Sequence, residues 1–407
     1  MASAAARAGE ADEKSSLAPE TREAVAQLAR ALLSARPLID VLENPVHVAP
    51  AVSGADAGAI ESLLNRIASR AGAPPFAVSA PASLTIFEKI VSAHLCANGL
   101  DRVASGISAA DARSIDQITD EAVQAGFDRR FHRIEVKGID GSLLNVYTAG
   151  HPASEPVIIL SACGIPARLS ERWIDILAKD RFVIIGETRG LFCPLSDADF
   201  DSLASDLSAQ ARDLFAVMDH FTIKTAHLMG LCGGAAVALQ AAAEQPQRIT
   251  SLTLCYGDFE LGPNAPRTVF QQNMKAVMAL AGASRNEAKS IHELFCDSMV
   301  KSARADLAHL IVYPFASSEL LFRYARLNGS IMNEQSDDLV AGISHPTLVI
   351  TSEDDQTAHP EGSRQVAALI PGAVLHVEPH GDHLSFYEAA PHLTGLVTDF
   401  LARVRKD

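Results

Sequence analysis

The chain of 407 residues is 48% hydrophobic and 20% charged, which is the composition of a globular protein with a large core and room for two or three domains. A formal net charge of −15 argues against nucleic acid or an anionic membrane as the main partner, and an aromatic content of 5% argues against base-stacking surfaces. The six cysteines form no Cys-x-x-Cys pair and have no histidine at metal-type spacing, so we expect reduced thiols in a cytoplasmic protein with no metal site, bound cofactor, secretion signal or membrane-spanning segment.

The first part of the chain has a helical pattern. Residues 1–18 are rich in Ala, Ser and Glu, and this composition predicts disorder. Residues 19–127 contain apolar stripes at helical spacing, such as Val25, Leu28 and Leu32. We therefore expect a helical N-terminal region there, and the sequence contains no internal repeat.

The pattern changes at residue 128. Short apolar runs then alternate with amphipathic helical segments, which predicts a mostly parallel sheet with helices on both faces. Residues from about 258 to 343 interrupt the alternation with helical segments alone, and the alternation then resumes to residue 407. A helical block inserted late in such a sheet is most simply a lid over the strand ends, where ligands bind.

The stretch "HLMGLCGG" places Cys232 on the sharp turn between a predicted strand and a predicted helix. Gly230 and Gly234, two residues before and after it, leave the strand and helix free to approach each other closely. The following helix directs its N-terminus at the site and favours a thiolate there. We interpret Cys232 as a nucleophile, and the alternative is a small buried cysteine of the core.

Two later strands end in residues that complete this chemistry. "TSEDD" carries the adjacent carboxylates Asp354 and Asp355, and "PHGDH" ends at His383. His383 would take the proton from Cys232 and later return it, while an aspartate would fix the imidazole tautomer. Spacing from the small residue Ser352 selects Asp355, with Asp354 as the less favoured alternative.

From residue 128 onward the chain resembles the α/β-hydrolase superfamily. The resemblance rests on the cysteine turn, on the order nucleophile, acid, histidine, and on "GETRG" at 186–190, which is similar to the Asp-x-Arg-Gly turn of that superfamily. It implies an α/β-hydrolase fold for residues 128–407. The departures are cysteine for serine, Cys163 for a loop histidine, and Ser352 for a usual glycine.

The resemblance also implies an oxyanion hole. One backbone N–H would come from Gly233, the residue after the nucleophile, and the second from Ile165 in the early loop "SACGIP". Arg168 and Arg172 follow that loop, either as part of a solvated helix face or as contacts for a phosphate-bearing arm of the substrate.

The cysteine turn, the helical N-terminal extension and the length together resemble a smaller group, the aminoacyl- or acyl-shuttling transferases of non-ribosomal peptide pathways such as those for syringomycin and coronamic acid. That resemblance implies an acyltransferase that carries an acyl or aminoacyl group as a thioester on Cys232 between the phosphopantetheine arms of carrier proteins (thiolation domains), in non-ribosomal peptide or related secondary-metabolite biosynthesis. The alternatives are a cysteine thioesterase or ester hydrolase that releases free acid, and a non-catalytic binding protein on a hydrolase fold. The sequence gives no oligomeric state.

Overall fold

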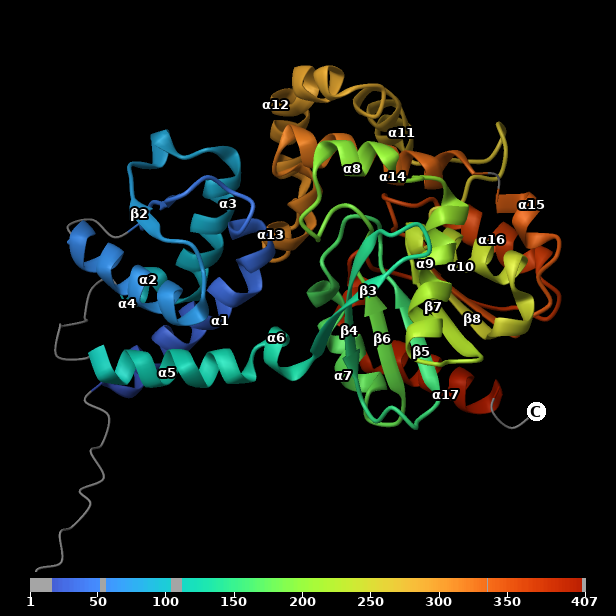
Figure 1. Cartoon of the computed structure of the whole chain (residues 1–407), viewed down its shortest axis with the longest axis horizontal. Coiled ribbons are helices and arrows are strands. Elements are labelled where there is room, and N and C mark those ends of the chain that lie inside the picture. The colour runs from blue at the N-terminus through green and yellow to red at the C-terminus, as the bar shows by residue number, and fades with distance from the viewer. Residues whose placement is uncertain (1–16, 52–55, 104–111, 335, 405–407) are drawn as a thin grey trace, which may run out of the picture. The chain divides into compact units, whose positions relative to one another are not determined.

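The computed structural model describes residues 17–51, 56–103, 112–334 and 336–404 (Figure 1), without the side chains of 300–302, 337 and 338. The chain divides into two compact units, Met1–Gly126 and Phe127–Asp407. The disorder predicted for residues 1–18 concerns residues that, apart from 17 and 18, lie outside the described part of the chain.

The first unit is mostly helical and contains a small parallel sheet that the sequence analysis missed. Local signals set its helix ends: a capping box between Thr85 and Glu88 begins α3, and Gly72 ends α2 in the left-handed conformation (φ 67°). Strands of three residues are too short for an alternating pattern to be recognised. The elements are α1 (Pro19–Ile39), β1 (Val46–Val48), α2 (Ala57–Ala71), β2 (Phe76–Val78), α3 (Ile86–Leu95), α4 (Asp101–Val103) and α5 (Ala112–Ala125).

The second unit is built on an eight-stranded sheet of order β10-β9-β8-β7-β5-β6-β4-β3. β3 and β4 pair antiparallel, as do β4 and β6, and the other neighbours pair parallel. The strands are β3 (His132–Lys137), β4 (Leu143–Ala149), β5 (Pro156–Leu160), β6 (Phe182–Gly186), β7 (Ala226–Leu231), β8 (Ile249–Cys255), β9 (Thr347–Ser352) and β10 (Val374–Glu378).

Helices cover the sheet, and α9 packs against α10 while α7 packs against α17 (Figure 1). The central strand β7 is buried along its whole length, as expected for a parallel strand covered on both faces. This architecture confirms the expected α/β-hydrolase fold. The helices outside the lid are α6 (Phe127–Arg130), α7 (Glu171–Leu177), α8 (Asp197–Ser202), α9 (Leu207–His220), α10 (Gly233–Glu244), α16 (Pro360–Leu369) and α17 (Pro391–Val404).

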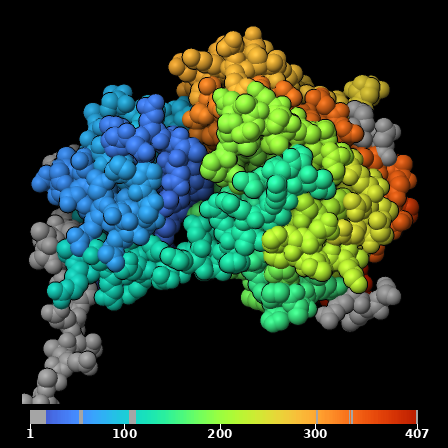
Figure 2. Space-filling view, viewed as in Figure 1, coloured from blue at the N-terminus to red at the C-terminus, as the bar shows by residue number. Residues whose placement is uncertain are grey.

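The chain between β8 and β9 forms the helical insertion that we call the lid. Its helix α14 packs against α11, α12 and the nucleophile helix α10. Ion pairs tie the lid to α8, from Arg285 to Asp201 at 3.0 Å and from Arg323 to Asp197 at 2.9 Å. Figure 2 shows the lid helices, in orange, adjoining the green surface of α8. The lid helices are α11 (Val269–Ala281), α12 (Arg285–Ser302), α13 (Ala308–Ile311), α14 (Ser318–Asn333) and α15 (Ser336–Val340).

Candidate active site

The turn between β7 and α10 holds Cys232 in a strained backbone conformation, with φ 53° and ψ −122°. Close packing explains the flanking glycines. A Cβ on Gly234 would lie 2.1 Å from the Leu160 carbonyl oxygen, and one on Gly230 would lie 2.6 Å from the Ala235 Cα. The turn therefore exists only because these two positions lack a side chain, and it presents the Cys232 thiol at the carboxyl edge of the sheet.

The fold brings His383 to this thiol from the loop after β10. The His383 side chain is buried and hydrogen-bonds to Cys232, and its Nδ1 lies 2.8 Å from Oδ2 of Asp355. The other oxygen of Asp355, Oδ1, accepts the backbone N–H groups of Thr357 and Ala358 at 2.8 and 3.0 Å. Both oxygens of the Asp355 carboxylate are thus fixed, and the imidazole is oriented between acid and thiol.

Asp354 points elsewhere. It is exposed, and its Oδ2 contacts Nδ1 of the exposed His380 at 3.1 Å. Between the two aspartates and the histidine loop lies the hydroxyl of Ser352, which accepts the Asp354 N–H at 3.3 Å and donates to the Gly381 carbonyl at 2.7 Å. The geometry therefore assigns Asp355 to His383, and Ser352 ties the loop of the acid to the loop of the base.

The electrostatics of this group favour a charged imidazole. Burial disfavours the protonated form of His383, but the negative charges at Cys232 and Asp355 outweigh that effect and raise the pKa of His383 well above its ordinary range. An imidazolium beside a sulfur nucleophile is the arrangement in which a cysteine attacks as a thiolate.

The backbone N–H groups of the two predicted oxyanion donors differ in whether they already have a hydrogen-bond acceptor. Gly233 is the first residue of α10, so its N–H has no carbonyl one turn earlier to bind. Ile165 lines the same cavity as Cys232, but its N–H donates to the Ala162 carbonyl at 3.2 Å, and the Gly164 N–H donates to the Thr188 hydroxyl at 3.0 Å. The oxyanion role of Gly233 and Ile165 stays a prediction, and for Ile165 it requires the bond to Ala162 to open.

A cavity of about 300 Å³ opens beside the thiol. Its walls come from the early loop, the lid and the loops that carry the acid and the base. Most of the side chains that line the cavity are apolar, and they include the methionines Met274, Met299 and Met332. An apolar cavity with few polar groups around a nucleophile is the form expected of a substrate site. The apolar part of the lining is completed by Ala162, Ile165, Leu169, Phe270, Ala303, Ile311, Val312, Pro314, Phe315 and Leu384.

Several polar residues of this cavity were missed by the sequence analysis. Asp258 follows β8, while Tyr324 and Asn328 lie four residues apart on α14 and share one face of that helix. Tyr387 also lines the cavity, from the segment after His383. Position at the carboxyl end of a strand next to the nucleophile strand was the one signal that could have indicated Asp258.

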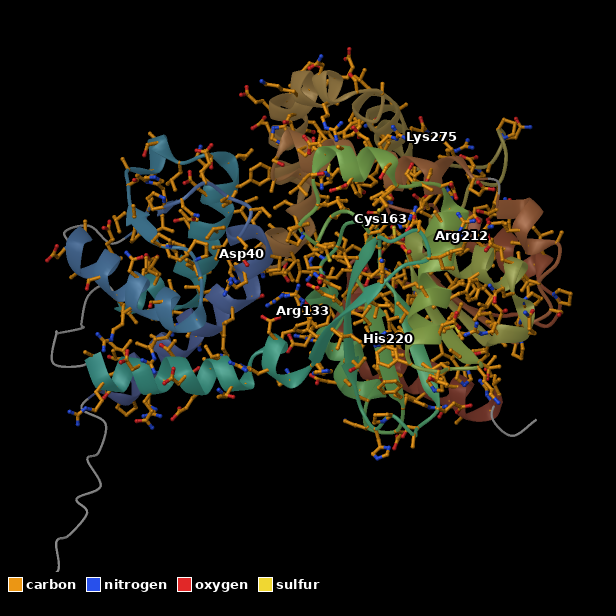
Figure 3. All side chains as sticks on the ribbon, viewed as in Figure 1. Asp40, Arg133, Cys163, Arg212, His220 and Lys275 are labelled. Atoms are coloured by element: carbon orange, nitrogen blue, oxygen red, sulfur yellow. The ribbon has the colours of Figure 1, made fainter. Side chains whose placement is uncertain are left out.

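The remaining motif residues are engaged in structural contacts. Glu187 of "GETRG" is half-buried and accepts the Ala167 N–H at 3.0 Å, and Arg189 of the same motif pairs with Asp213 at 2.7 Å. Arg168 pairs with Asp128 at 3.0 Å, and Arg172 donates to the Glu388 carbonyl at 3.1 Å. Cys163 (labelled in Figure 3) is buried and lines the same cavity as Cys232, and burial raises the pKa of its thiol above the ordinary range.

Within the described part of the chain, no group of three His, Cys, Asp or Glu side chains is placed to hold a metal ion. Across the same residues, none of the helices combines the length and the apolar character needed to cross a bilayer.

Comparisons with known proteins agree with the α/β-hydrolase fold. Residues 187–394 match the model of the "Alpha/beta hydrolase family". The chain is 25% identical over 201 residues to a putative carbamate hydrolase RutD of Variovorax paradoxus (strain S110), which covers 49% of this chain and 74% of that protein. It is 28% identical over 204 residues to a 2-hydroxy-6-oxononadienedioate/2-hydroxy-6-oxononatrienedioate hydrolase of Comamonas testosteroni, covering 47% of this chain and 68% of that protein.

Solved structures show the same fold at low sequence identity. An enol-lactonase from Burkholderia xenovorans LB400 aligns with a TM-score of 0.52 at 21% identity, over 66% of this chain and 100% of that chain. A thermophilic esterase from Thermogutta terrifontis aligns with a TM-score of 0.52 at 22% identity, over 67% of this chain and 99% of that chain.

Proposed function

The chain belongs to the α/β hydrolase family, and on that premise we propose that it is an acyl hydrolase that cleaves an ester or thioester through a covalent intermediate on Cys232. The observation that carries the proposal is the fixed series Asp355, His383, Cys232 at the wall of an apolar cavity. The relatives named above as hydrolases support water as the final acceptor.

The chemistry follows from the positions of these three groups. The Cys232 thiolate attacks the carbonyl carbon, and the carbonyl oxygen becomes an oxyanion near the start of α10. The imidazolium of His383 gives its proton to the departing alcohol or thiol as the bond to the acyl carbon breaks. His383 then accepts a proton from a water molecule, whose oxygen attacks the thioester, and the free acid leaves as the thiol is restored.

The charges in the cavity argue against a dicarboxylic substrate like those named for the Comamonas relative. Asp258, Asp354 and Asp382 line the cavity. Among the described residues, Arg304 is the arginine that lines the cavity. Its guanidinium already pairs with Asp306 at 2.7 Å and Glu388 at 2.9 Å. An acyl group without a second carboxylate therefore fits this lining better.

The test is intact-protein mass spectrometry with a panel of nitrophenyl esters and N-acetylcysteamine thioesters. Wild-type protein should carry a mass increase equal to the acyl group, and hydroxylamine should remove it. Cys232→Ala should give neither adduct nor turnover, and Cys232→Ser serves as a control of equal size with a weaker nucleophile. Turnover that survives in Cys232→Ala, or no Cys232-dependent adduct with any member of the panel, would overturn the proposal.

A second candidate is the acyltransferase expected from the sequence, in which carrier-protein phosphopantetheine thiols donate and accept the acyl group. The sulfur nucleophile supports it, because exchange between thioesters is close to thermoneutral and keeps the acyl group activated. The paired state of Arg168 and Arg304 gives it no support, since a phosphate-bearing arm needs free cations. Product analysis separates the two candidates: with pantetheine added, a hydrolase releases mainly free acid and a transferase mainly acyl-pantetheine.

A further inference from the structure

Asp258 is a carboxylate beside the nucleophile that the reaction above does not use. It follows β8, the strand next to β7, and its backbone N–H lies 3.4 Å from the Cys232 carbonyl oxygen. Its side chain lines the cavity together with Cys232 and His383. It does not orient the imidazole, because Nδ1 of His383 is taken by Asp355.

Among the residues that the structure describes, one neutral side chain holds this carboxylate. Oδ1 of Asp258 accepts Nε2 of Gln271 on the lid helix α11 at 2.6 Å. Gln271 is itself fixed, since its Oε1 accepts the backbone N–H groups of Thr268 at 3.0 Å and His359 at 3.1 Å. The Asp258 carboxylate therefore stands in a defined position, and its second oxygen remains available to a bound molecule.

The positive charge of His383 favours the ionised form of Asp258, but no ion pair joins Asp258 to a cation of the described residues. Lys275 (labelled in Figure 3) and Arg267, which are on the lid, both bind Glu260, and Arg304 binds Asp306 and Glu388. Burial outweighs the effect of His383 and raises the pKa of Asp258, because a charge in an apolar surrounding is unfavourable. A cation bound from outside would remove this cost.

Helix α14 adds two neutral acceptors to the lining of the same cavity. Tyr324 and Asn328 on α14 face the cavity, and Nδ2 of Asn328 donates to the Met332 sulfur at 3.4 Å, which leaves its amide oxygen as an acceptor. Burial raises the pKa of Tyr324 well above its ordinary range, so its hydroxyl stays uncharged. A carboxylate, a hydroxyl and an amide oxygen suit the three N–H donors of an ammonium group.

We propose that Asp258 is a specificity-determining residue whose carboxylate binds an ammonium group carried on the acyl part of the substrate, close to the reacting carbonyl. The inference rests on the proposed function, because it concerns the acyl group that Cys232 would receive. The apolar walls would hold the rest of that acyl group, and a neutral acyl group would leave the carboxylate without an ion-pair partner.

Pairs of thioesters that differ only in charge test the proposal. The 2-aminopropanoyl and 2-methylpropanoyl thioesters of N-acetylcysteamine differ by an ammonium in place of a methyl, and the 3-aminobutanoyl and 3-methylbutanoyl thioesters differ in the same way one carbon further out. We expect wild-type protein to prefer an ammonium member by ~10-fold or more in kcat/KM. Asp258→Asn, which keeps size and can still accept from Gln271, should reduce that preference by ~10-fold and leave kcat/KM for the methyl member within about threefold.

Asp399→Asn is the matched control, because it removes an exposed carboxylate on α17 that does not line the cavity and should leave the preference unchanged. A wild-type preference for the methyl members, or an Asp258→Asn variant that slows both members equally, would overturn the inference while Cys232 acylation still supports the proposed function. If no member of either pair acylates Cys232 while nitrophenyl esters do, this inference alone fails; if the nitrophenyl esters give no adduct either, the proposed function fails with it. Tryptophan fluorescence verifies that each variant is folded.

Discussion

Gly234 offers the sharpest test of why the cysteine turn has the form it has. Replacing it by alanine places a Cβ 2.1 Å from the Leu160 carbonyl oxygen, roughly 1.3 Å short of the 3.4 Å at which ordinary contact begins. Because the clashing atoms belong to the backbone at the end of β5, no side chain can rotate away. The helix α10 must therefore move from the sheet, or the peptide after Leu160 must turn.

Overpacking of this kind costs ~1 to 3 kcal/mol, and more where rigid backbone is involved, so we expect Gly234→Ala to lower the free energy of unfolding by about 3 kcal/mol. Gly233→Ala is the control on the adjacent residue: its Cβ would lie 3.4 Å from Ile331 side-chain atoms, and alanine favours the helix by up to about 1 kcal/mol. It should change the free energy of unfolding by about 1 kcal/mol or less.

The assay uses the single tryptophan of the chain. Trp173 is buried in the second unit, stacks on Phe386 at 4.6 Å and donates to the Phe386 carbonyl at 2.7 Å. Its fluorescence in urea titrations therefore reports the unfolding of the unit that contains the turn. The reasoning is refuted if Gly234→Ala unfolds at the same urea concentration as wild type and its Cys232 is acylated at the same rate.

Three further results are expected. Asp355→Asn should lower kcat by on the order of 10³-fold or more, because the imidazole loses the partner that orients it, whereas Asp354→Asn should stay within about twofold; ester turnover compares them. The raised pKa of His383 stabilises the fold fully below about pH 6.5, and that contribution is lost as pH rises through the folded-state pKa. Urea titrations from about pH 6.5 upward should show the free energy of unfolding falling with pH in wild type, and a flatter pH profile in His383→Gln. Ser352→Ala should cost ~1 to 2 kcal/mol of stability, because the Gly381 carbonyl and the Asp354 N–H lose their partner; a loss below about 0.5 kcal/mol would show that water replaces the hydroxyl.

The part of the site that the sequence predicted depends on short stretches of chain. A glycine-flanked cysteine between strand and helix, and an acid and a histidine after later strands, each carry their own local signal, and parallel strands place their carboxyl ends at one edge. The fold class was confirmed for the same reason. Spacing from Ser352 favoured Asp355 over Asp354, although adjacent residues differ in the direction of their side chains, which spacing does not reveal. The structure shows that direction: Asp355 faces His383.

The rest depends on contacts between distant segments. Tyr324 and Asn328 reach the cavity because α14 of the lid packs on α10, and no local pattern records that packing. The Ile165 N–H is engaged because it donates to the Ala162 carbonyl in a turn, and residue spacing does not reveal such a hydrogen bond. The order of the reacting groups was therefore accessible from the sequence, while the recognition of the acyl group was not.

Cys232 sets the energy of the acyl-enzyme intermediate, and the lining of the cavity determines which acceptor takes the acyl group. A thioester on Cys232 keeps the acyl group activated, so water and thiols can both accept it. Arg304 stands where the lid meets the loop of His383, between Asp306 on one side and Asp382 and Glu388 on the other. The cavity that an acceptor must enter is mostly apolar, and the guanidinium of Arg304 in its lining is already paired. That guanidinium is not available to an anionic acceptor arm, whereas water needs no cation, and this supports the proposal of hydrolysis even though sulfur chemistry would permit transfer.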